Sequence, residues 1–208
     1  MSDRKEHWES VYQNNSLLGL SWYQEEPGLS LQLIRNTHIA LDAPIIDVGG
    51  GASVLVDKLL DDGYTNIGVL DVSAQALAVA KNRLGGRAPG VNWYEEDVTL
   101  FRPPGQVSLW HDRAVFHFLT SKADRERYIN VLKHTLAGGG HLIIMAFAID
   151  GPVKCSGLDI VQYDTNKLMS ELGSDFELKE SGYETHITPA GKQQKFAYFH
   201  LLFTPETF

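Results

Sequence analysis

The distribution of apolar and polar positions divides the chain into a helical beginning, a central alternation of short apolar runs with helical stripes, and a strand-rich end. Residues 3–14 show apolar side chains at helical spacing and predict a short amphipathic helix. A second helix is predicted to start near Ser30, with its apolar positions at Leu31, Ile34, His38 and Leu41.

From residue 44 onward, short apolar runs alternate with helical patterns. The predicted strands are Pro44–Val48, Asn66–Leu70, Val91–Glu95, Val107–Trp110 and His141–Ala148. Between them, helices are predicted over residues 54–62, after a cap at Ser73, and after a cap at Ser121, the last closed by Gly138–Gly140. Continuous apolar strands separated by helices are typical of a parallel sheet that is buried on both faces.

The end of the chain has a different pattern. Asp164 caps a predicted helix that runs to Leu172, and two strand-like runs follow, Phe176–Ile187 and Lys195–Phe203. A turn at residues 188–191 joins them, which predicts an antiparallel hairpin. We therefore predict an α/β fold with a mostly parallel sheet of seven strands, helices on both faces and a C-terminal hairpin. At 208 residues it fits one domain, 1–208, with an N-terminal helical segment over 1–41 and an α/β core over 42–208.

Acidic residues and glycines follow the predicted strands, at the edge where open parallel sheets bind ligands. Asp47 precedes Gly49, Gly50 and Gly51, and Asp71 with Val72 follows the second strand. An acid about twenty residues beyond a glycine turn suits a ribose diol. The third strand leads to Asp97 and Val98, and an ionised carboxylate there can accept a hydrogen bond from a purine amine. These positions predict a site for an adenosine-bearing ligand.

Two differences from known nucleotide-binding motifs restrict the kind of adenosine-bearing ligand that this site could bind. A dinucleotide fingerprint starting at Gly49 requires glycine where Val54 stands, and the loop has no lysine, which excludes a P-loop. Asp47, ahead of the glycines, suits a cationic amino group better than a pyrophosphate. The pattern favours S-adenosylmethionine (SAM).

The segment Asp47-Val48-Gly49-Gly50-Gly51-Ala52-Ser53 resembles the first motif, [D/E]-x-G-x-G-x-G, of the class I SAM-dependent methyltransferases, with Ser53 in place of the last glycine. The resemblance spans about residues 44–204 and implies a Rossmann-like fold. It also implies that the cofactor contacts lie at Asp47, Gly49, Gly50, Gly51, Asp71, Val72, Asp97, Val98 and His111. In this family the stretch after the fourth strand, here His111–Arg113, lies beside the methionine part and the methyl group.

The N-terminal segment has a narrower resemblance. His7–Tyr12 followed by Ser21–Gln24 is similar to bacterial-type methyltransferases that carry a helical lid ahead of the sheet. Trp110-His111-Asp112-Arg113 resembles the corresponding stretch of the thiopurine and tellurite methyltransferase branch.

The residues expected around the methyl acceptor each allow a second interpretation. Asp112 is the candidate catalytic base or acceptor-orienting group, but it could instead pair with Arg113 or cap a helix. Trp22 and Tyr23 are candidate walls of the acceptor site or core anchors. Arg113 and His117 are candidate substrate contacts, and His117 equally fits a hydrogen-bonded core histidine.

Several classes of function are disfavoured. His111 and His117 lack the spacing of a helical metal site, and the one cysteine, Cys155, belongs to no Cys/His cluster, so we expect no metal. The N/D-P-P-Y/F stretch of many amino-methyltransferases of nucleic-acid bases is replaced by Asp112-Arg113-Ala114-Val115. A net charge of −8 disfavours nucleic acid and anionic membranes as partners. The N-terminus lacks a signal-peptide pattern, and a cytoplasmic protein is expected.

The expected activity is transfer of the SAM methyl group to nitrogen, oxygen or sulfur of a small molecule by in-line displacement, with S-adenosyl-L-homocysteine as product. Such a reaction depends on alignment and exclusion of water more than on a catalytic triad. The alternatives are a protein lysine methyltransferase of the same fold and a SAM-binding protein without catalysis. The acceptor and the oligomeric state stay open.

Overall fold

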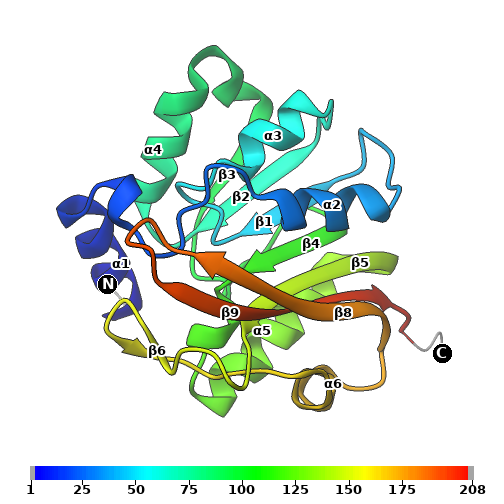
Figure 1. Ribbon diagram of the computed structural model, residues 1–208. Coiled ribbons are helices and arrows are strands. Elements are labelled where there is room, and N and C mark those ends of the chain that lie inside the picture. Colours follow the sequence, from blue (N-terminus) through cyan, green and yellow to red (C-terminus); the bar gives the residue numbers. More distant parts are fainter. Residues whose placement is uncertain (1–2, 206–208) are drawn as a thin grey trace.

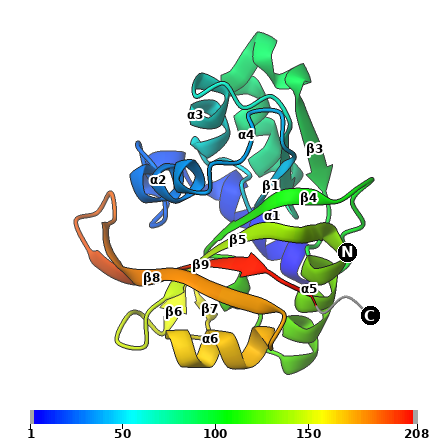
Figure 2. The same cartoon turned by 90° about the vertical axis from the view of Figure 1, so that its right-hand side faces the viewer.

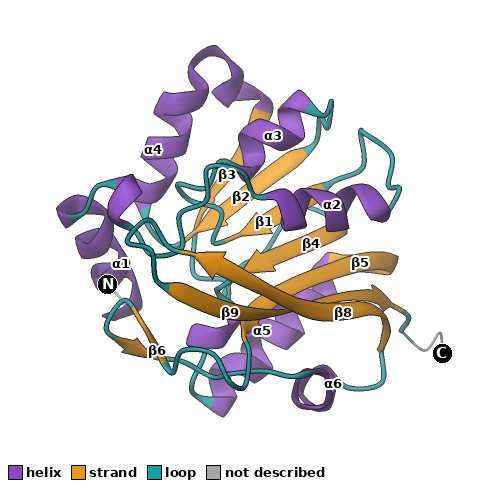
Figure 3. Ribbon diagram, viewed as in Figure 1, coloured by secondary structure: helices purple, strands orange, loops and turns teal. Residues whose placement is uncertain are grey.

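A seven-stranded sheet forms the centre of the protein, with helices on both of its faces (Figures 1 and 3). The structure is a computed structural model that describes residues 3–205, so residues 1, 2 and 206–208 of the predicted domain lie outside the described residues. The strands occur in the order β3-β2-β1-β4-β5-β9-β8, and β9 is antiparallel to both of its neighbours. Their bounds are β1 Ile45–Val48, β2 Ile67–Asp71, β3 Val91–Glu95, β4 Val107–Arg113, β5 Leu136–Phe147, β8 Phe176–Ile187 and β9 Gln193–Phe203.

Two hydrophobic cores lie on opposite faces of this sheet. One face is covered by α2 Gly28–Asn36, α3 Leu55–Asp61 and α4 Ala74–Leu84, and the other by α5 Lys122–Thr135 and α6 Thr165–Leu172 (Figure 2). The first helix, α1 Asp3–Asn14, lies at the carboxyl ends of the parallel strands (Figure 1). The remaining elements are short: η1 Leu17–Gly19, η2 Gly85–Gly90, η3 Phe116–Phe118, β6 Lys154–Cys155 and β7 Leu158–Asp159.

The predicted α/β fold, the seven strands and the C-terminal hairpin are confirmed. The three predicted helix caps are confirmed as well, because each side-chain oxygen accepts a hydrogen bond from a backbone N–H of the first turn. Ser73 Oγ accepts from Ala76 at 3.1 Å, Ser121 Oγ from Asp124 at 3.2 Å and Asp164 Oδ1 from Lys167 at 2.8 Å.

The prediction for the second helix was wrong at its C-terminal end. α2 ends at Asn36, and His38 adopts a left-handed backbone conformation with φ of 53°, which is incompatible with a continuing helix. Leu41 lies beyond the helix with 52% of its surface exposed. Its agreement with the helical period was therefore coincidental.

The boundaries of β4 and β5 also differ from the prediction. β4 continues to Arg113 because β1 pairs with it as far as Asp112, opposite Val48. β5 begins at Leu136, which pairs with Val107 across a register irregularity, so Gly138–Gly140 lie inside the strand instead of closing α5. The sequence pattern missed both extensions because polar side chains and glycines interrupt the apolar runs.

Within residues 3–205, we find no helix with the length and apolar character that a membrane crossing requires.

Candidate functional site

Two adjoining cavities lie at the carboxyl ends of β1, β2 and β4, beneath α1 and the loop that follows it. Trp22, Val48, Gly49 and Arg113 line both of them. The larger cavity is also lined by Arg4, Trp8, Tyr12, Leu70, Asp71, Val72, Glu96, Asp97, Val98, Ala114, Val115, Phe118, Leu119, Phe147, Cys155, Gln194 and Phe196. The smaller one is lined by Tyr23, Gln24, Ser30, Asp47, Gly50 and His111 among others.

The glycine turn after β1 forms the floor shared by the two cavities. The Gly49 N–H donates to the Leu70 carbonyl at 2.7 Å, which joins the turn to the end of β2. Gly49 has φ of 67°, and a Cβ at this position would lie 2.2 Å from Val115 Cγ2. Glycine is therefore required here by the backbone conformation and by the close approach of η3.

Asp47 is buried beside this turn and is held by a histidine of the neighbouring strand. Asp47 and His111 are register partners, and His111 Nδ1 donates to Asp47 Oδ1 at 2.7 Å. Ser30 Oγ from α2 lies 3.0 Å from the other ring nitrogen. The second carboxylate oxygen of Asp47, Oδ2, is buried and has no hydrogen-bond partner within residues 3–205. His111 thus positions an acid that keeps one acceptor atom available for a cationic ligand group.

Asp71, at the end of β2, lines the larger cavity. Its Oδ1 accepts a hydrogen bond from the Ser73 N–H at 2.8 Å. Burial raises its pKa to about 7, the Ser73 hydrogen bond opposes this rise, and the nearby carboxylates of Asp47 and Glu9 add to it. A Cβ on Gly51 would lie 2.3 Å from Asp71 Oδ2, so the glycine turn makes room for this carboxylate.

Glu9 attaches α1 to the sheet end. Its carboxylate accepts hydrogen bonds from the Ser73 hydroxyl at 3.1 Å, the Ala74 N–H at 2.7 Å and the Gln75 N–H at 3.3 Å. These groups lie at the N-terminus of α4, where the unpaired N–H groups and the helix dipole favour a negative charge. An acid on α1 therefore caps α4 across 64 residues of sequence.

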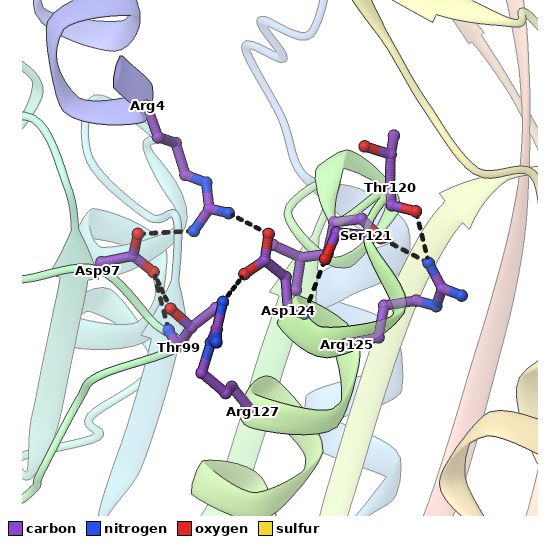
Figure 4. Close-up of polar contacts among 9 residues, drawn as sticks. Arg4, Asp97, Thr99, Thr120, Ser121, Asp124, Arg125 and Arg127 are labelled. Carbon is purple, nitrogen blue, oxygen red and sulfur yellow. Dashed lines mark hydrogen bonds and ion pairs between the residues drawn. The ribbon is translucent and has the colours of Figure 1, made fainter. Parts of the chain in front are cut away.

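Arg4 makes a second attachment, which Figure 4 shows. Its guanidinium donates to Asp97 at 2.6 Å and to Asp124, in the first turn of α5, at 3.0 Å. Asp97 Oδ1 also accepts from the N–H and the hydroxyl of Thr99, and Asp124 pairs with Arg127. Arg4 thus bridges the segment after β3 and α5, and α1 closes the cavity between them.

Aromatic rings form the wall between α1 and the sheet. Trp8 packs edge-on against Trp22 and Phe118, with ring centroids 5.6 Å and 5.0 Å apart, and Tyr12 packs against Trp22 at 6.3 Å. Trp22 was predicted to be either a wall or a core anchor, and the structure places it in both positions at once. Tyr23 lines the smaller cavity.

Asp112 lies on the opposite face of β4, away from both cavities. It is completely buried and accepts hydrogen bonds from the Tyr128 hydroxyl at 2.6 Å, the Val115 N–H at 2.9 Å and the Phe116 N–H at 3.1 Å. Burial raises its pKa to about 6, against the effect of these hydrogen bonds. The structure therefore gives Asp112 the capping role that the sequence left open, and we do not retain it as a candidate base.

His117 also lies behind the cavity lining. It is completely buried, its ring packs against Phe147 and Phe118, and its Nδ1 accepts from the Phe147 N–H at 3.3 Å. Burial, reinforced by the nearby Arg113, lowers its pKa to about 3. His117 is thus a neutral ring that supports the two phenylalanines of the wall.

The structure brings together most of the predicted site residues, from four strand ends, whereas Gly51, Asp112 and His117 line neither cavity. The sequence interpretation missed Arg4 and Glu9, because their roles depend on where α1 docks. It also missed Phe147, which ends β5 and follows the same strand-end rule. Cys155, Gln194 and Phe196 come from segments whose position depends on the C-terminal hairpin. In the described residues, no group of three or more His, Cys, Asp or Glu side chains is arranged to hold a metal ion.

A methyltransferase domain family matches residues 46–142 of the chain. EEF1A lysine methyltransferase 2 of Mus musculus is 26% identical over an alignment of 157 residues, and the match covers 67% of this chain and 64% of that protein. Its Homo sapiens counterpart is 24% identical over 193 residues, with 85% and 75% covered. The eEF1A lysine and N-terminal methyltransferase of Mus musculus is 29% identical over 101 residues; the match covers 48% of this chain and only 14% of that protein.

Solved structures share the fold over nearly the whole chain. The N-methyltransferase NodS from Bradyrhizobium japonicum, in complex with S-adenosyl-L-homocysteine, aligns with a TM-score of 0.72 and 16% identity, covering 98% of this chain and 100% of that chain. The 1,6-didemethyltoxoflavin-N1-methyltransferase of Burkholderia thailandensis aligns with a TM-score of 0.68 and 15% identity, covering 97% and 84%. The matches span less than two thirds of the length of both Mus musculus relatives. Residues 46–142 thus match a methyltransferase domain, and the whole chain shares the fold of SAM-dependent methyltransferases of known structure.

Proposed function

We propose that the protein transfers the methyl group of SAM to a small-molecule acceptor that binds in the larger cavity. The observation that carries this proposal is the lining of the cavity: α1, the Trp22 loop and the start of β9 all contribute to it above the strand ends. A concave site lined from several elements can surround a small acceptor and limit the access of water to the reacting atoms.

The residues that could bind the parts of a SAM molecule are distributed over the two cavities. We assign the ribose to Asp71, the adenine to the Asp97–Val98 segment and the methionine part to the glycine turn beside Asp47. The unpaired Asp47 Oδ2 fits a cationic amino group, and Asp71, whose Oδ1 accepts from the Ser73 N–H, lines the larger cavity. Val72, Gly50 and Gly51 complete this assignment as close backbone contacts.

When bound, SAM supplies a methyl group on a sulfonium, which passes to a nucleophile by in-line displacement. The contribution of the chain is to align and shield the two partners. Phe118, Phe147 and Phe196 give the larger cavity an apolar wall, and Trp22 lines both cavities. We assign no side chain as general base, because neither Asp112 nor His117 lines the cavity.

The activity can be measured as conversion of SAM to S-adenosyl-L-homocysteine with a panel of small amines, phenols, thiols and carboxylic acids. We expect turnover with at least one class and none without acceptor. A protein that binds SAM tightly but methylates no member of the panel and no protein would instead be the non-catalytic SAM-binding protein considered above.

A protein lysine is the second candidate acceptor. The sequence matches favour it, because the relatives from Mus musculus and Homo sapiens described above are named as eEF1A lysine methyltransferases. Incubation of the protein and labelled SAM with a cell lysate separates the candidates. Label in a discrete protein band, with a mass increase of about 14 Da (one methyl group less a hydrogen), would support lysine methylation, whereas label confined to the small-molecule fraction supports our proposal.

A further inference from the structure

Arg113, the last residue of β4, lines the larger cavity, and the Nε–Nη2 edge of its guanidinium has no hydrogen-bond partner within residues 3–205. Its Nη1 donates to the Trp22 carbonyl at 3.2 Å, and its guanidinium lies over the Phe196 ring, 4.7 Å from the centroid. The two remaining nitrogens, Nε and Nη2, are buried and have no hydrogen-bond partner within residues 3–205. Burial lowers the pKa of Arg113 to about 10, so the group is still charged at neutral pH.

The same edge of other arginines in this chain holds a carboxylate. Arg35 donates from Nε and Nη2 to the two oxygens of Asp62, at 2.8 and 2.7 Å. Arg83 also uses Nε and Nη2 on a carboxylate: Nε donates to Asp57 Oδ1 at 3.2 Å and to Oδ2 at 3.0 Å, and Nη2 donates to Oδ2 at 2.6 Å. The parallel N–H groups of this edge match the two oxygens of a planar carboxylate.

The surroundings of Arg113 also favour an anion. Within residues 3–205 no carboxylate lies within ion-pair distance of Arg113; Glu184 on β8 acts on it from farther away and raises its pKa, and the buried Oε2 of Glu184 has no hydrogen-bond partner there. A buried guanidinium that no carboxylate contacts directly gains from a ligand that brings one to its Nε–Nη2 edge.

A surface groove leads to this point. Cys155 and Gln194 line both the groove and the larger cavity. The groove lies between the β6 region and the turn of the β8–β9 hairpin, and its lining includes Lys192 and Lys154, of which Lys154 pairs with Asp159 at 3.1 Å. In a chain with a net charge of −8, the lysines at this groove favour the approach of an anion.

We propose that the methyl acceptor carries a carboxylate, and that the Nε–Nη2 edge of Arg113 binds this group. The proposal rests on the proposed small-molecule methyltransferase function and specifies its substrate class. The carboxylate enters through the groove, and the Trp22 loop or the hairpin turn opens locally to admit it. The body of the acceptor then lies against Phe118 and Phe147. A protein lysine, which is cationic, is disfavoured beside this guanidinium.

The test uses the protein loaded with S-adenosyl-L-homocysteine and two matched probe pairs, benzoate with benzamide and acetate with acetamide, titrated by NMR. We expect at least one carboxylate to bind about tenfold or more tightly than its amide. Arg113→Gln should abolish this difference, Arg113→Lys should retain part of it, and the surface variant Arg35→Gln should retain all of it.

Two results would overturn the inference. One is equal affinity of each carboxylate and its amide for the wild-type protein. The other is a loss of S-adenosyl-L-homocysteine affinity in Arg113→Gln as large as the loss for benzoate, which would assign the guanidinium to the carboxylate of the cofactor instead. Failure of the wild-type protein to bind S-adenosyl-L-homocysteine at all would contradict the proposed function itself, and is thereby distinguished from both.

Discussion

At the scale of single residues, Asp71 contributes the acid assigned to the ribose of the cofactor. We expect Asp71→Ala to weaken binding of S-adenosyl-L-homocysteine by about 10- to 150-fold, because hydrogen bonds to a charged group are worth about 1.5–3 kcal/mol. Calorimetric titration measures the change. Asp42→Ala, which removes an exposed carboxylate outside both cavities, serves as the control, and equal affinities of the two variants would remove the ribose assignment.

Asp71 also gives the stability of the unliganded protein a pH dependence. Its pKa of about 7 in the folded state lies above its ordinary value of 3.8, so the folded state holds a proton that the unfolded state has lost. The stabilisation is therefore complete below the ordinary pKa and disappears as the pH rises toward 7, by about 1.4 kcal/mol per pH unit. Asp112, with its pKa of about 6, acts in the same direction.

Comparison with Asp71→Asn isolates this contribution. The free energy of unfolding of Asp71→Asn, relative to the wild type, should rise between about pH 4 and 7 at the slope given above. Urea denaturation at several pH values measures it. A difference that does not change with pH would show that burial does not perturb this carboxylate.

At the scale of elements, α1 depends on tertiary contacts, because its sequence is polar and its aromatic face needs the Trp22 loop as partner. Glu9 ties it to the N-terminus of α4. We expect Glu9→Ala to lower the free energy of unfolding by about 0.5–2 kcal/mol, the range for a lost helix cap. Glu6→Ala, an exposed acid on the same helix, is the matched control; denaturation curves that coincide for both variants would contradict the capping role.

Alternation along β4 explains where its polar residues point. Leu109 belongs to the core beneath α2 and α3, whereas Trp110 belongs to the core beneath α5. Side chains of a strand alternate between faces, so His111 joins Asp47 on one side while Asp112 joins Tyr128 and Trp110 on the other. The predicted end of this strand at Trp110 concealed the alternation, and this is why Asp112 was expected at the acceptor site.

At the scale of the whole molecule, the sheet is buried on both faces. Leu142 and Ile143 are adjacent residues of β5, both fully buried, and belong to different cores. We expect Leu142→Ala and Ile143→Ala each to lower the free energy of unfolding by about 2–5 kcal/mol. Thr185→Ala, exposed on the edge strand β8, should change it by less than about 0.5 kcal/mol. A small effect at one of the two core positions would mean that one face of the sheet is loosely packed.

The sequence by itself determined the order of strands and helices, the three helix caps and the acids at the strand ends. These features depend on local chemistry: apolar periodicity, a side-chain oxygen at the first turn, and glycines beside Asp47 and Asp71. Because parallel strands end at one edge of a sheet, that local order was enough to predict that these acids and glycines lie close together.

Only the tertiary structure decided which residues surround the cavity to which we assign the methyl acceptor. The docking of α1 through Arg4 and Glu9 joins residues more than sixty positions apart, and no local pattern encodes such contacts. The true length of β4 is set by its pairing with β1, and that pairing directs Asp112 into the core and Arg113 into the cavity. The Nε–Nη2 edge of Arg113 likewise depends on tertiary structure: β8 brings Glu184 near enough to raise the Arg113 pKa, but within residues 3–205 this edge has no hydrogen-bond partner.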